Sequence, residues 1–280
     1  MTGIMRVTSP ADSATFSISA GPEWPTIEVV TDAAGPHTWT WTISWKSFSM
    51  SGVDNTPGNR WNARAAIQDR GGTLTVRASA GVGSASTAIK IVGTNPDPST
   101  VTAYLAQDAQ SAGFDKILEK ESRGRNFGAN GEPIRSFDNG FGMCQLTNPR
   151  PSYEECWNWQ LNVDAGLRLF VQKRGAALAY LAQGGRTYTT DQLNHEAVSR
   201  WNGGAYHEWD GTNGRWVRKA NVLCDSQTGN IGWDMNDPIN LGRSEAELRG
   251  RDRGGYSAGP TATAHWKYFG VCYADSILGG

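Results

Sequence analysis

The sequence lacks both an excess of one charge and any long apolar run. Its 280 residues contain 26 Lys and Arg against 27 Asp and Glu, so no field of one sign draws the chain to nucleic acid or to an anionic membrane. No stretch approaches the roughly 18 apolar residues that a membrane span needs. The N-terminal MTGIMRVTSPADSATFSISAG contains no apolar signal-peptide core. We therefore expect no nucleic-acid or membrane partner, and delivery by a secretion machine or a phage, or a place within a longer polypeptide.

Residues that bind metals are few and scattered. The 4 cysteines and 4 histidines match no zinc-binding spacing, and HEAVS at His195 lacks the second histidine of a zinc-protease helix. The acidic segment DSQTGNIGWDMND lacks the alternating ligands and the final glutamate of a calcium-binding loop. We therefore expect no metal and no other cofactor. The sequence allows one or two disulfides, in a pairing that stays open, among Cys144, Cys156, Cys224 and Cys272.

Aromatic residues, by contrast, are plentiful. The chain has 12 tryptophans, whose flat apolar rings with a single N–H donor suit the faces of sugars, although any one tryptophan is more often part of a core. A chain of 280 residues also exceeds what one core usually holds, so we expect two domains.

The first of these domains is expected at residues 1–97, where apolar and polar residues alternate. TWTWTISWK places Trp39, Trp41, Ile43 and Trp45 on one face, and TLTVRAS, TAIKIVG, ATFSISA and TIEVV follow the same period. Short strands separated by Gly and Pro predict an antiparallel β-sandwich of the immunoglobulin-like kind. We interpret it as a docking or wall-binding module.

The period changes after GTNPDPST, and a mainly α domain is expected at residues 98–280. VTAYLAQDAQSAG and GFDKILEKES predict short helices, residues 163–183 predict a longer one, and TDQLNHEAVSRW and ATAHWKYFG predict two more. A Gly-rich and Trp-rich insertion at about residues 203–260 has little periodicity, and we expect hairpins and ordered loops there.

One glutamate stands where an apolar residue is expected. In FDKILEKES the apolar stripe of Phe114, Ile117 and Leu118 continues to Glu121, whereas Glu119 falls on the opposite face. Partial burial and the negative end of the helix are both expected to raise the pKa of the Glu121 carboxyl. A carboxylic acid of this kind can protonate the leaving oxygen of a glycosidic bond.

Two later segments add groups suited to sugar binding. SFDNGFGMCQLTNPRP places Gly140 and Gly142 around Phe141, followed by Gln145, whose amide offers both a donor and an acceptor. AVSRWNGGAYHEW ends a helix at Trp201 and turns through two glycines.

Together, Glu-Ser at a helix end, Gly-Phe-Gly-Met-x-Gln and aromatic-Asn-x-Gly resemble the lysozyme-like fold of goose-type lysozymes and soluble lytic transglycosylases. The resemblance covers roughly residues 100–204. It implies that Glu121 is the catalytic acid and that a glycan cleft is formed by further residues. These are Ser122, the backbone around Phe141 and Met143, Gln145, Trp201, Asn202, Gly203 and Tyr206.

The sequence departs from the family at two positions and leaves the second carboxylate open. Cys144 replaces an aliphatic residue and is expected to be buried, and Trp201 stands where tyrosine is common. Inverting and retaining hydrolases need a second carboxylate, whereas a transglycosylase does not. Asp138 is the best-placed candidate, although a turn-capping role in SFDNG is the alternative.

The resemblance implies a peptidoglycan glycosidase, a muramidase that cleaves between N-acetylmuramic acid and N-acetylglucosamine. Its partners would be glycan strands, with an immunity protein or a component of a secretion or tail machine, and it would act on the wall in the periplasm of a target cell. Three alternatives stay open: a lytic transglycosylase, a glycan-binding or structural tail protein without activity, and a cysteine peptidase or amidase that uses Cys144 or Cys156 with a distant histidine.

Overall fold

The computed structural model describes residues 5–137 and 139–279, which divide into two compact units. The first unit contains the chain up to Gln107 together with Glu121–Gly166, and the second contains Asp108–Lys120 together with Leu167–Gly280. The first unit thus combines residues from both sides of Asp97. The separate roles assigned to residues 1–97 and 98–280 stay a prediction.

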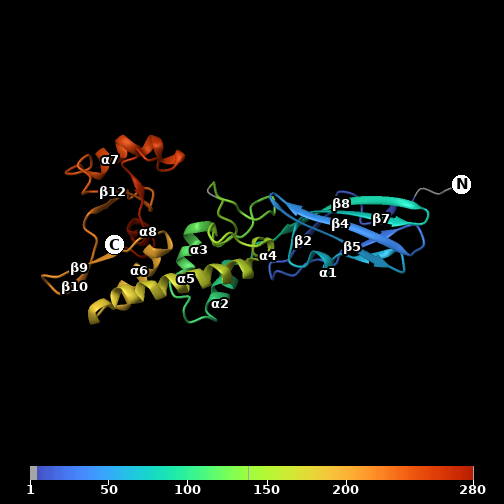
Figure 1. The fold of residues 1–280 in the computed structure, drawn as a ribbon, viewed down its shortest axis with the longest axis horizontal. Helices are drawn as coiled ribbons and strands as arrows, with labels where there is room; N and C mark the ends of the chain where they lie inside the picture. The colour runs from blue at the N-terminus through green and yellow to red at the C-terminus, as the bar shows by residue number, and fades with distance from the viewer. Residues whose placement is uncertain (1–4, 138, 280) are drawn as a thin grey trace. The chain divides into compact units, whose positions relative to one another are not determined.

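Two sheets form most of the first unit, the larger having the strand order β2-β8-β7-β4-β5 and the smaller β1-β3-β6 (Figure 1). The larger sheet consists of β2 (Thr15–Ile18), β4 (His37–Trp45), β5 (Phe48–Thr56), β7 (Gly72–Ala80) and β8 (Gly83–Gly93). The smaller sheet consists of β1 (Val7–Ser9), β3 (Glu28–Thr31) and β6 (Arg60–Asn62).

The alternation in TWTWTISWK correctly predicted a half-buried strand. Along β4 the three tryptophans and Ile43 are buried, and the Thr and Ser residues between them are exposed or half-buried. Trp61 of β6 stacks against Trp39 and Trp41, with ring centroids 6.2 and 6.4 Å apart. Each such side chain removes on the order of 200 Å² from water on burial, so this tryptophan cluster stabilises the core that the two sheets share.

The predicted combination of an antiparallel immunoglobulin-like sandwich and a mainly α domain is wrong. β2 pairs parallel to β8, and the second unit contains two further sheets. The described structure is 32% helix and 27% strand, and its strands form several small sheets of 2 to 5 strands. An alternating pattern identifies a strand and its buried face but not its partner or direction, and this is why the sequence missed the arrangement.

Most of the predicted helices are present, with shifted ends. The structure has α1 (Arg64–Ile67), α2 (Pro98–Leu105), α3 (Phe114–Ser122), α4 (Tyr153–Trp157), α5 (Trp159–Leu181), α6 (Thr190–Trp201), α7 (Glu245–Asp252) and α8 (Gly270–Leu278), with 3-10 turns at η1 (Gln183–Gly185) and η2 (Arg253–Ala258). The helix predicted over ATAHWKYFG is wrong, because β13 (Lys267–Tyr268) lies there and α8 begins only at Gly270. None of the helices in the described residues is long and apolar enough to cross a membrane.

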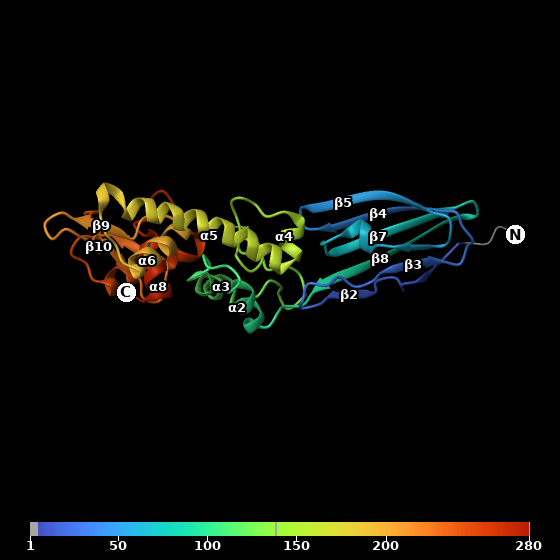
Figure 2. The same cartoon turned by 90° about the horizontal axis from the view of Figure 1, so that it is seen from below.

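The insertion predicted at about residues 203–260 forms hairpins and loops, but it also contains the helix α7 and the turn η2, which the sequence did not predict. β9 (His207–Asp210) pairs with β10 (Arg215–Arg218), and β11 (Val222–Cys224) pairs with β12 (Ile231–Asp234), which also pairs with β13. A disulfide between Cys224 and Cys272 joins β11 to α8. Helix α8 lies beside α6 in both views (Figures 1 and 2).

Candidate functional site

The end of α3 carries Glu121 at the border between core and solvent. Phe114, Ile117 and Leu118 are buried along one face of α3, and Glu121, the next position on that face, is half-buried. Glu119 is exposed. Ser122, which follows directly, is buried. The apolar stripe therefore correctly predicted that Glu121 is partly buried and that Glu119 is exposed.

The charge of Glu121 acts on the thiol of Cys144. Burial raises the pKa of this thiol well above its ordinary value, and the carboxylates of Glu121 and Asp164 raise it further. Glu121, Cys144 and Asp164 all belong to the first unit.

Cys144 belongs to a tight hairpin, Phe141–Leu146, which we call the site loop. Its two ends exchange backbone hydrogen bonds, each 3.1 Å long, between Phe141 and Leu146. Gly142 has φ 72° and Gln145 has φ 50°, so two residues adopt the left-handed region that glycine favours. A Cβ at Gly142 would collide with Asn162 Nδ2 and lie 2.7 Å from Asn126 Oδ1. Glycine is therefore required at position 142.

Two fully buried asparagines hold the site loop from beneath. Asn126 Oδ1 accepts a hydrogen bond from the Met143 N–H at 3.0 Å, and Asn162 Oδ1 accepts one from the Cys144 N–H at 2.9 Å. The Asn162 side chain also donates to the Phe141 carbonyl oxygen at 3.3 Å. Because buried polar groups must be paired, these bonds fix the loop's shape. Sequence reasoning missed both asparagines. A signal existed only for Asn162, whose polar amide lies on the buried face of α5.

Gln145 is the residue of the site loop whose side chain can contact a ligand. Its Nε2 donates to the Gly142 carbonyl oxygen at 2.6 Å, which holds the side chain against the loop. Within the described part of the chain, its Oε1 has no hydrogen-bond partner. The side chain is half-buried. It therefore presents a positioned acceptor to a hydroxyl or amide N–H.

The side chains of Phe141 and Met143 point into the core instead of lining an open cleft. Both are buried, and the Phe141 ring lies edge-on to Trp45 and Phe48 at 5.8 and 5.7 Å. Only the backbone of this part of the loop can contact a glycan.

The predicted turn after α6 lies in the second unit, whereas Glu121 and the site loop lie in the first. Trp201 is half-buried and packs edge-on against Phe114, with ring centroids 5.5 Å apart. Asn202 is the C-cap of α6, and Gly203 has φ 94°. The turn packs against α8, where a Cβ on Gly270 would lie 2.6 Å from the Gly203 carbonyl oxygen.

The remaining two predicted site residues have different outcomes. Tyr206 is buried, and its hydroxyl donates to Asp275 Oδ1 at 2.6 Å. Burial and this hydrogen bond raise the pKa of the Tyr206 hydroxyl, so a structural role accounts for its contacts. Asp138 lies outside the described residues.

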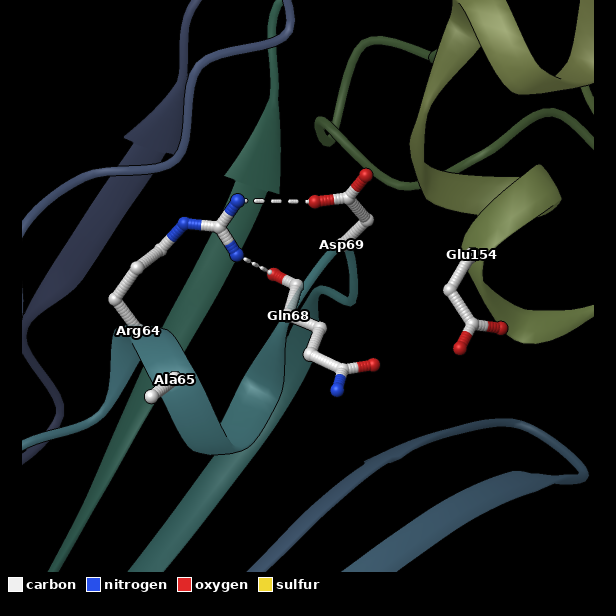
Figure 3. A pocket seen from close by; sticks show the side chains of 5 residues that line it. All are labelled: Arg64, Ala65, Gln68, Asp69 and Glu154. Carbon is white, nitrogen blue, oxygen red and sulfur yellow. Dashed lines mark hydrogen bonds and ion pairs between the residues drawn. The ribbon is translucent and has the colours of Figure 1, made fainter.

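A separate polar hollow of about 420 Å³ lies between α1 and α4, within the first unit (Figure 3). Arg64 pairs with Asp69 at 3.0 Å and also donates to the Gln68 carbonyl oxygen. Glu154, on α4, pairs with Arg70. Since its charged side chains already have partners, we interpret this hollow as a junction between the sheet and α4.

The buried thiols do not suit nucleophilic catalysis. Cys144 and Cys156 are buried and form no disulfide, and burial raises the pKa of Cys156 to about 12. A thiolate is the reactive form of cysteine, so the cysteine peptidase alternative is disfavoured.

The acidic segment DSQTGNIGWDMND uses its carboxylates in contacts within the protein. Asp225 pairs with Arg249 at 2.9 Å and accepts a hydrogen bond from the Tyr256 hydroxyl at 2.9 Å. Within residues 5–137 and 139–279, no cluster of three or more His, Cys, Asp or Glu side chains could hold a metal ion.

Comparison with protein-family models and with curated proteins found no match to this sequence.

Proposed function

We propose that this protein is a peptidoglycan glycosidase that cleaves the β-1,4 bond between N-acetylmuramic acid and N-acetylglucosamine, with Glu121 as the general acid. One observation carries the proposal: Glu121 is half-buried at the end of an apolar stripe, and its charge raises the pKa of the Cys144 thiol in the anchored site loop. A carboxyl group at the border of a core, within reach of solvent, can deliver a proton to a glycosidic oxygen.

The site loop supplies the binding groups in this proposal. Gln145 Oε1 accepts a hydrogen bond from a sugar hydroxyl or from the N–H of an N-acetyl group. The buried amides of Asn126 and Asn162 keep the loop backbone fixed. A preorganised loop of this kind spends little binding energy on ordering itself.

Hydrolysis and transglycosylation differ in their need for a second carboxylate. Asp164 lies near Cys144, but its Oδ1 accepts a hydrogen bond from the Tyr104 hydroxyl at 2.8 Å. This contact favours a supporting role for Asp164. Mass spectrometry of digested peptidoglycan separates the two reactions, because reducing ends indicate hydrolysis and 1,6-anhydro ends indicate transglycosylation.

The substitution Glu121→Gln tests the proposal. It should lower the release of muropeptides from purified walls by about 10²-fold to 10⁴-fold, the range for loss of a general acid, with an unchanged unfolding temperature. Glu119→Gln, on the exposed face of the same helix, is the matched control and should keep full activity. Full activity of Glu121→Gln would end the proposal, and binding of glycan without turnover by the wild type would favour a non-catalytic glycan-binding protein.

The proposal sets the place of action at the cell wall of a target cell. It leaves an immunity protein, or a component of a secretion or tail machine, as the protein partner to search for.

A further inference from the structure

A second hollow, of about 260 Å³, lies at one end of the five-stranded sheet in the first unit. Ser44 of β4 is opposite Thr73 of β7, and Thr73 is opposite Lys90 of β8. Directly opposed residues on neighbouring strands point to the same side of a sheet. The two hydroxyls and the Lys90 ammonium therefore form a row along one wall, and we call this hollow the cationic hollow.

A second lysine and one glutamate complete the lining of the cationic hollow. Lys46 stands in the turn between β4 and β5 with φ 49°, and its Nζ lies 5.6 Å from the centre of the Trp45 ring. Glu132 Oε2 accepts a hydrogen bond from Trp45 Nε1 at 3.2 Å. Across the described residues, neither Lys46 nor Lys90 has an ion-pair partner. Both lysines are exposed, so their two ammonium groups are available to a ligand. The neighbouring Glu132 carboxylate already accepts a hydrogen bond from the Trp45 indole.

One side chain separates the cationic hollow from the site loop. Trp45 lines the hollow and also packs edge-on against Phe141, with ring centroids 5.8 Å apart. The wall that carries Glu132 is held to β8, where the Gly93 N–H donates to the Gly131 carbonyl oxygen at 2.7 Å. The same chain segment begins at Asn126, which anchors the site loop. The hollow and the loop are thus neighbours within one unit.

We propose that the cationic hollow binds the carboxylates of the peptide stems on the glycan strand, an inference that rests on the proposed function. Two lysines and two hydroxyls match an anionic oxygen ligand, and the sugars of a peptidoglycan strand carry their carboxylates on the attached peptides. The protein would therefore prefer strands whose stems carry free carboxylates to strands whose stem carboxylates are neutralised as amides. Exposed ion pairs each change binding only a few-fold, so this preference is expected to be about five-fold to ten-fold.

The test compares kcat/KM on two substrates, both free of teichoic acid: glycan strands whose peptide stems carry free carboxylates, and the same strands after those carboxylates have been converted to amides. The wild type should prefer the strands with free carboxylates. The double variant Lys46→Gln/Lys90→Gln should lose this preference and keep its rate on the amidated strands. Arg77→Gln, on the exposed face of the same sheet with its Nη2 bonded to Ser84, is the matched control and should keep the preference.

Three outcomes overturn the inference. It fails if the wild type shows no preference, or if the double variant keeps the preference. It also fails if millimolar inorganic phosphate abolishes the preference and teichoic acid binds more tightly than peptide-bearing strands, because the hollow would then select phosphate groups. Absence of turnover on both substrates would instead contradict the proposed function. In that case, co-sedimentation of the wild type and the double variant with the two kinds of strand tests the inference by binding alone.

Discussion

Asn162 holds Cys144 in place with both its side chain and its backbone. Its Oδ1 accepts from the Cys144 N–H at 2.9 Å, and its carbonyl oxygen accepts from the Cys144 thiol at 3.4 Å. Asn162 stands on α5 and is completely buried. One helix position therefore fixes the centre of the site loop.

Replacing this amide should destabilise the fold and slow turnover together. Asn162→Ala leaves the buried Cys144 N–H without its partner and removes one of the two hydrogen bonds that the Phe141 carbonyl oxygen accepts, the other coming from the Leu146 N–H. An orphaned buried donor costs about 1–3 kcal/mol and a lost hydrogen bond about 1 kcal/mol, so we expect a loss of about 2–4 kcal/mol in the free energy of unfolding, measured with urea. Asn213→Ala removes an exposed amide that bonds Asp210 and should change stability by less than about 0.5 kcal/mol. Equal stability of the two variants would contradict the anchoring role.

Gly142 should tolerate no side chain. Gly142→Ala places a Cβ against Asn126 and Asn162 at a residue with φ 72°, and so combines backbone strain with steric overlap. Gly113→Ala has a similar φ of 88° but meets nothing within 4 Å, so it measures the backbone cost alone, about 1 kcal/mol. Thermal unfolding should show the larger loss for Gly142→Ala, and an equal loss in both variants would remove the steric argument.

The disulfide should contribute substantially to stability. It links cysteines 48 residues apart, and constraining a loop of that length in the unfolded chain is worth about 4 kcal/mol. We expect Cys224→Ser/Cys272→Ser to unfold at lower urea concentration than the oxidised wild type. A reducing agent should lower the stability of the wild type and leave that of the double variant unchanged. If reduction leaves the wild type as stable as before, this prediction is wrong.

Stability should fall in acid through Glu196, a buried carboxylate of α6. Burial raises the pKa of this carboxyl, but hydrogen bonds from the His207 side chain and N–H, together with Arg200, outweigh it and lower the pKa below the ordinary value of 4.5. A lowered folded-state pKa contributes stability above the unfolded-state pKa, and this is lost as pH falls through the folded value. Urea unfolding from pH 7 to pH 3 should show this loss, and Glu196→Gln should flatten the profile over that range. The same slope in both proteins would exclude Glu196 as its source.

The sequence by itself determined the elements whose pattern is local. The period of two in β4, the stripe of α3 that ends at Glu121, and the helix α6 follow from neighbouring residues along the chain. The same reasoning distinguished Glu121 from Glu119 and placed Cys144 in the core.

Only the tertiary structure decided which distant residues meet. The parallel pairing of β2 with β8, the disulfide among four cysteines, and the burial of Tyr206 against Asp275 depend on long-range packing. The roles of Asn126 and Asn162 could not be predicted from the sequence, because the backbone N–H groups that they bind lie 17 and 18 residues away along the chain. Local periodicity records which side of an element faces the core, whereas the partner across that core is chosen by the whole fold.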